Sequence, residues 1–171
     1  MAENPFTKTD PARSSESAAP AINRALVAQS DPLILSGAGW FWWIAGLSVV
    51  NTIMMHSGAD RSFVIGLGFT LVADAIFKEM KLVAFIIDAL ALAIFFGFGF
   101  LSRKGHLWAF VTGIALYTLD AGIYVLGQDW MSVAFHGLAL FYMIRGANAL
   151  RAALKAAATP PPVIAPPPVA G

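Results

Sequence analysis

Three ionisable residues lie alone inside long apolar stretches of the chain, and they are the residues best placed for chemistry. Asp88, Asp120 and His136 each fall in a different stretch. Two carboxylates and an imidazole that met in a low-dielectric bundle could pass protons or bind a cation. The structural alternative is a buried polar cluster that fixes the register of the helices. The sequence does not distinguish this cluster from a proton or cation site. We assign no metal site and no cofactor.

The three residues are expected at a similar depth in a membrane. The stretches 82–101 and 107–126, followed by 131–144 and its continuation, have the length an α-helix needs to cross about 30 Å of hydrocarbon. The short links between them make consecutive helices antiparallel. Counted from the nearest helix end at about 1.5 Å per residue, the three side chains lie roughly 7 to 9 Å inside one leaflet. They are predicted to form one polar layer.

Four further polar residues are secondary candidates. Tyr117 and Tyr124 flank Asp120 by one turn on either side, so their hydroxyls could donate to its carboxylate. Asn51 is expected to make a hydrogen bond between helices. Asp74 precedes Lys78 by four residues, the favourable order for a helical ion pair near an interface.

Composition indicates an integral membrane protein. The chain is 58% hydrophobic and 12% charged, with a mean hydropathy of +0.70. A net charge of +1 argues against a nucleic-acid partner. The absence of cysteine excludes disulfides and thiolate chemistry, and no Gly-x-Ser-x-Gly or His-Glu-x-x-His motif is present. We therefore expect no enzyme.

The predicted fold is an all-α, polytopic transmembrane bundle of five apolar helices over residues 36–150. A tail at 1–35, disordered or lying at the surface, precedes it, and a basic, then Pro-rich, disordered tail at 151–171 follows. The helices are expected at about 36–56, 62–78, 82–102, 106–127 and 131–150. The second is short for a membrane span, because its apolar part at 63–77 reaches only some 23 Å. The alternative is four spans plus one short helix that does not cross.

Charge predicts the orientation. In either topology the richest basic segments, Arg103-Lys104 and the stretch from Arg145 to Lys155, share one side. The positive-inside rule puts that side, with the C-terminus, in the cytoplasm.

The runs SFVIGLGFTLVAD at 62–74, RKGHLWAFVTGIALYTLD at 103–120 and DWMSVAFHGLAL at 129–140 resemble a family of small, uncharacterised bacterial multi-spanning membrane proteins. The resemblance covers about residues 40–150 and implies a bacterial inner membrane, with no reaction attached. We expect an accessory or scaffold protein whose partners are the lipid bilayer and a membrane protein or a second copy. The alternative is a small proton- or cation-coupled carrier that uses Asp88, Asp120 and His136.

Overall fold

The computed structural model describes residues 24–56, 67–77 and 79–158, and all regular structure within them is helical. This confirms the predicted all-α class. A short helical segment at 24–30 precedes the main helices. Their bounds are α2 (Pro32–His56), α3 (Gly68–Ile76), α4 (Lys81–Arg103), α5 (Leu107–Leu126) and α6 (Trp130–Ala158).

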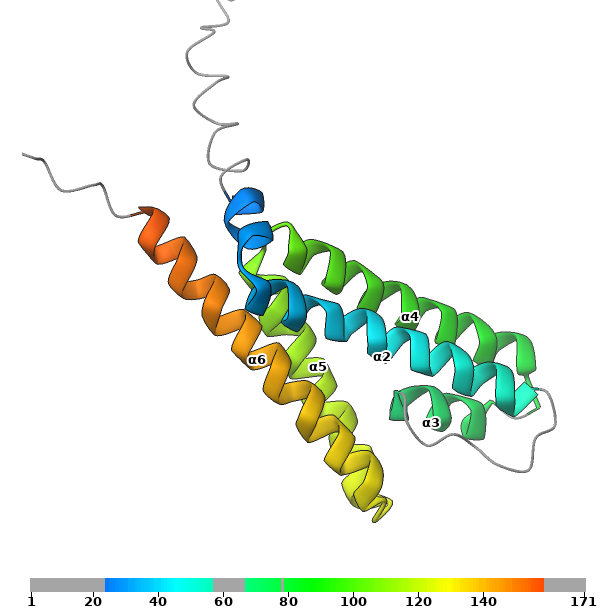
Figure 1. Ribbon diagram of the computed structural model, residues 1–171. Coiled ribbons are helices and arrows are strands. Elements are labelled where there is room, and N and C mark those ends of the chain that lie inside the picture. Colours follow the sequence, from blue (N-terminus) through cyan, green and yellow to red (C-terminus); the bar gives the residue numbers. More distant parts are fainter. Residues whose placement is uncertain (1–23, 57–66, 78, 159–171) are drawn as a thin grey trace, which may run out of the picture.

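The four long helices form two pairs that spread apart from a shared end (Figure 1). α2 packs on α4 and on α6, α5 packs on α6 and α4, and the short α3 contacts α4 and α5. In Figure 1, α3 lies between the pairs at the wide end. The shared end contains the start of α2, the end of α4 and the turn into α5.

Glycine sets how closely α2 and α6 approach. A Cβ built on Gly37 would lie 2.8 Å from the Cα of Gly146, so the two backbones touch at this crossing. Small residues permit such contact between membrane helices. The start of α2 therefore lies beside the later part of α6, and the two helices run in opposite directions.

Aromatic rings fill the centre of the shared end. The ring centroid of Phe41 lies 5.9 to 6.2 Å from those of Phe95, Phe98 and Phe110, which come from α4 and α5. Gly113 leaves room for the Phe41 ring, because a Cβ there would overlap it. This cluster holds α2, α4 and α5 together.

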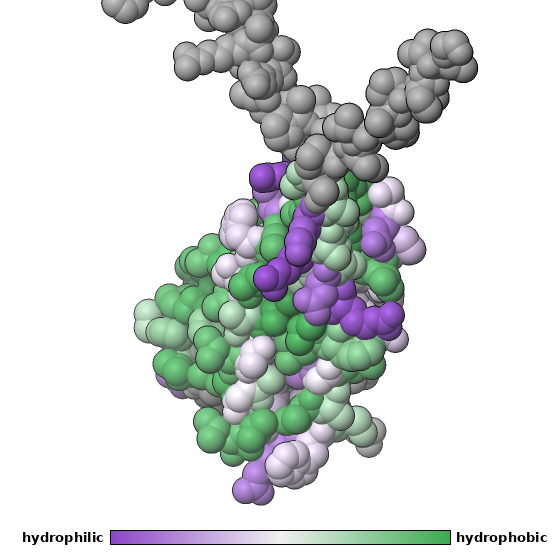
Figure 2. Space-filling model, turned by 90° about the vertical axis from the view of Figure 1, so that its left-hand side faces the viewer, coloured by the Kyte–Doolittle hydropathy of each residue, from purple (hydrophilic) through white to green (hydrophobic). Residues whose placement is uncertain are grey.

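Among the described residues, three helices are long and apolar enough to cross a membrane: the segments at 32–54, 81–103 and 107–126. Their outward faces carry large apolar side chains, with Trp43 68%, Leu82 73% and Leu119 72% exposed. On the face shown in Figure 2, apolar residues cover much of the surface, and most of the hydrophilic residues lie in its upper half. Apolar surface of this extent suits contact with lipid.

The structure corrects the prediction of five apolar spanning helices. Of the second, expected at 62–78, the described residues contain the nine-residue α3, whose length of about 14 Å is less than half of a hydrocarbon core, and 62–66 and 78 lie outside the described residues. α6 has 29 residues and is less apolar, because it carries His136, Arg145, Arg151 and Lys155. It therefore does not reach the hydropathy of the other three.

The first and last of the five predicted helices extend beyond their expected bounds. α2 begins at Pro32 rather than at 36, because the carboxylate of Asp31 accepts the amide of Leu33 at 2.8 Å and proline suits the first helical turn. α6 runs on to Ala158 rather than ending at 150. Its last turns are rich in alanine, the best helix former, and Leu150 is buried there together with Ala28 of the 24–30 segment.

Candidate functional site

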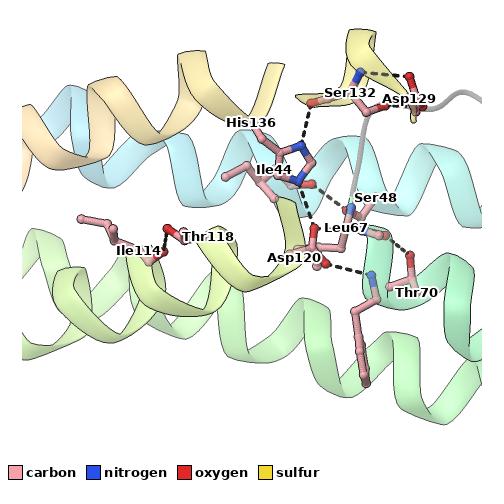
Figure 3. A network of polar contacts seen from close by, with 12 residues as sticks. Ile44, Ser48, Leu67, Thr70, Ile114, Thr118, Asp120, Asp129, Ser132 and His136 are labelled. Carbon is pink, nitrogen blue, oxygen red and sulfur yellow. Dashed lines mark hydrogen bonds and ion pairs between the residues drawn. The ribbon is translucent and has the colours of Figure 1, made fainter. Parts of the chain in front are cut away.

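The start of α3 is bound by a carboxylate from α5. Asp120 accepts the backbone N–H of Gly68 through Oδ2 at 2.9 Å and that of Phe69 through Oδ1 at 2.8 Å (Figure 3). The first N–H groups of a helix have no partner inside it, and the helix dipole favours negative charge at this end. Asp120 is only 5% exposed, so the charge-assisted bonds form away from water. It caps α3 from another helix.

Two hydroxyls complete the cap. Ser48 of α2 accepts the N–H of Leu67 at 2.8 Å and donates to the carbonyl of Ile44 at 2.9 Å. Thr70 donates to the carbonyl of Leu67 at 2.7 Å. The amides of residues 67, 68 and 69 thus all bond to side chains of α2 and α5. Backbone N–H groups must find such partners wherever water is absent.

His136 of α6 is the third donor to Asp120. Its Nε2 lies 3.0 Å from Oδ2 of Asp120, and its Nδ1 lies 2.8 Å from the carbonyl oxygen of Ser132. A carbonyl can only accept, so Nδ1 carries a proton. Nε2 then faces a carboxylate, and one further proton must lie between the two groups. His136 thus links the Asp120 carboxylate to the backbone of α6 through its two ring nitrogens.

Two tyrosines enclose the imidazole. The Tyr117 ring stacks on His136 with centroids 4.3 Å apart and planes 15° apart, and the Tyr124 ring lies at 4.9 Å and 47°. The hydroxyl of Tyr117, expected to donate to Asp120, is buried without a hydrogen-bond partner in the described part of the chain. The ring of Tyr117, rather than its hydroxyl, serves the site.

Tyr124 also explains a glycine. A Cβ on Gly68 would lie 2.7 Å from Cε2 of the Tyr124 ring. Glycine at the first position of α3 therefore allows the helix end to come close to α5, where the carboxylate of Asp120 accepts its amide. A larger residue at 68 would separate the two.

The structure brings Asp120 and His136 together and places Asp88 elsewhere. Asp88 is 1% exposed and accepts a long hydrogen bond, 3.4 Å, from the hydroxyl of Thr52 on α2. In the described ranges, no three His, Cys, Asp or Glu side chains group closely enough to hold a metal ion. α4 meets α2 at this level, and so Asp88 faces a different helix from the other two residues.

The structure describes one of the two remaining candidates, Asn51, and not the Asp74–Lys78 pair. Asn51 is buried, and its Oδ1 has no hydrogen-bond partner within residues 24–56, 67–77 and 79–158. The expected ion pair of Asp74 with Lys78 lies outside the described residues. Sequence reasoning missed Ser48 as a site residue, although its place one turn before Asn51 on the same face was a usable signal.

No family model, no curated protein and no solved structure matches this chain. The geometry of the site is therefore the basis for a functional proposal.

Proposed function

We propose that this chain is a four-span integral membrane protein of the accessory or scaffold type, in which α3 enters the bilayer without crossing it. Two observations support four spans. α3 has only nine residues, and the start of α2 lies beside the later part of α6 at the contact of Gly37 with Gly146. An even number of crossings puts these two ends on one side, whereas five crossings would separate them. On this proposal α6 crosses despite its polar residues, with Leu138, Phe141 and Ile144 facing lipid.

The same end of the bundle is proposed to face the cytoplasm of a bacterial cell. Arg103 and Lys104 lie at the end of α4, and Arg145, Arg151 and Lys155 lie on the later part of α6. The positive-inside rule favours this orientation, and the family resemblance supports the inner membrane. The outward apolar side chains leave surface for lipid and for a membrane-protein partner or a second copy.

One observation carries the accessory role: the Asp120 carboxylate accepts two α3 amides and the His136 imidazole. A transport site exchanges its ligands for a substrate, whereas these ligands complete a helix cap. Removing either partner would leave buried polar groups unsatisfied. The pair therefore serves to hold α3 in place.

A carrier remains the second candidate because of a groove between α4 and α5. Its volume is about 580 Å³, its walls are apolar, including Leu90, Ile94 and Leu119, and Asp120 reaches its lining. A groove that leads from lipid to a proton-bearing pair is an arrangement that proton coupling requires.

Proton flux separates the two candidates. We expect purified protein in liposomes, under an inward proton gradient read by an internal pH dye, to give no flux above empty liposomes. We expect His136→Gln to lower the thermal stability, while His106→Gln, a matched change at the start of α5, lowers it little. The accessory role would be overturned, and the carrier established, if the native chain gave proton flux and His136→Gln abolished that flux without lowering the melting temperature.

A further inference from the structure

We propose that the outer face of α2 is a binding site for one anionic phospholipid, with the lipid phosphate at Arg103. A groove of about 540 Å³ follows this face. Its floor comes from residues one helical turn apart on α2, and its walls come from α4 on one side and α6 on the other. The lining residues are Leu35, Ser36, Gly39, Trp40, Trp43, Leu47, Arg103 and Phe135.

Arg103 supplies a fixed cation at one end of this groove. Its guanidinium lies 4.1 Å from the centroid of the Trp42 ring, a cation–π contact that orients the planar group. The indole of Trp42 is itself held, because it donates to the carbonyl of Phe96 at 3.3 Å and fits against Gly99, where a Cβ would overlap it. The cation is thus placed before any ligand arrives.

Arg103 has an N–H donor that is available to an added acceptor. Its Nε is buried and has no hydrogen-bond partner, and no carboxylate lies within ion-pair distance of its side chain among the residues the structure describes. A buried donor without an acceptor is costly, so an added acceptor at Arg103 would bind favourably.

The shape and polarity of the groove select a lipid over a soluble anion. Ser36 and Arg103 provide its polar part, and Trp43, Leu47 and Phe135 continue it with an apolar part that opens to the membrane. A phosphate with an acyl chain matches both parts, whereas inorganic phosphate matches only the first. Arg103 belongs to the basic end of the bundle, where anionic lipid gathers at a cytoplasmic leaflet.

Gly39 keeps the groove open. A Cβ on Gly39 would lie 3.7 Å from an Nη atom of Arg103, an ordinary contact distance, so the position tolerates a side chain. A leucine there would occupy the groove without touching the packed core. This gives a blocking variant that leaves Arg103 in place.

The test compares lipids with the same acyl chains and different headgroups. The full chain in detergent is titrated with dioleoyl phosphatidylglycerol or dioleoyl phosphatidylcholine, and one-to-one complexes are counted by native mass spectrometry. We expect phosphatidylglycerol to bind at least about fivefold more tightly, from one cation near an anionic headgroup. Arg103→Gln should abolish the preference. Lys104→Gln, which removes the neighbouring exposed cation over Phe100, should keep it.

Gly39→Leu should lower the affinity for both lipids while its melting temperature stays near that of the native chain. Inorganic phosphate at matched ionic strength should not displace phosphatidylglycerol. Equal binding of the two lipids, a preference that survives Arg103→Gln, or displacement by phosphate alone would each overturn the lipid site.

Discussion

Replacing Asp120 with asparagine tests whether the carboxylate holds α3. The carboxylate accepts the amides of Gly68 and Phe69 and the imidazole of His136. Asparagine keeps one oxygen, so one α3 amide loses its acceptor, and the ionic part of all three bonds is lost. A charge-assisted bond contributes about 1.5 to 3 kcal/mol, and breaking a buried ion pair costs about 3 to 5 kcal/mol.

We expect the free energy of unfolding to fall by about 3 kcal/mol, the lower limit of the cost of breaking a buried ion pair. The amide group of asparagine can still hydrogen-bond to the imidazole, so His136 keeps a partner. For a chain of this size, about 3 kcal/mol corresponds to a melting temperature lowered by roughly 6 to 12 °C. Thermal unfolding in detergent measures this change.

A second measurement, the labelling rate of a thiol on α3, tests whether the substitution loosens α3 itself. The chain has no cysteine, so a single introduced cysteine is its only thiol for labelling. Thr70 of α3 is 2% exposed, and Thr70→Cys should react slowly with maleimide in the otherwise native chain. Adding Asp120→Asn should speed the reaction, because α3 then detaches more often.

Asp129→Asn is the matched control. Asp129 accepts the amide and the hydroxyl of Ser132 at the start of α6. Losing that cap should cost about 1 kcal/mol and leave the labelling of the α3 thiol unchanged. If Asp120→Asn melts no lower than this control and the α3 thiol stays protected, the carboxylate does not hold α3, and the reasoning fails.

Two further predictions address the bundle as a whole. Gly37→Leu should cost about 3 kcal/mol, because its Cβ would lie 2.8 Å from the backbone of α6, while Gly46→Leu, which has open space around it, should change the melting temperature little. In oriented membranes, thiols at Ser30→Cys and Lys104→Cys should label from one side and Gln128→Cys from the other; Ser30 and Lys104 on opposite sides would rule out four spans.

The sequence predicted the long helices well, because apolar runs of about 20 residues have few other structures open to them. Depth counting also put Asp120 and His136 at one level, and a short turn between antiparallel helices brings them into contact. Depth counting does not predict which neighbour a helix faces, and so it could not predict the partner of Asp88. α4 packs on α2 there, and Asp88 meets Thr52.

The extent of α3 was beyond sequence reasoning for a physical reason. A helix start is usually marked by a local Ser, Thr, Asp or Asn, but the residue before α3 is Leu67, which has no capping side chain. Its caps come from Ser48 and Asp120, which are 19 residues before Leu67 and 52 residues after Gly68. Such a boundary is fixed only when the bundle assembles.

The buried ion pair follows from the short helix. A helix that begins among other helices, away from water, presents N–H groups that must be bonded, and a carboxylate bonds two of them at once. A carboxylate buried alone is costly, so it needs further hydrogen-bond partners, and His136, enclosed by two aromatic rings, lies 3.0 Å from it. On the proposed function, Asp120, His136 and the two tyrosines together hold α3 in place. A group that merely passed protons would not need the amides of α3.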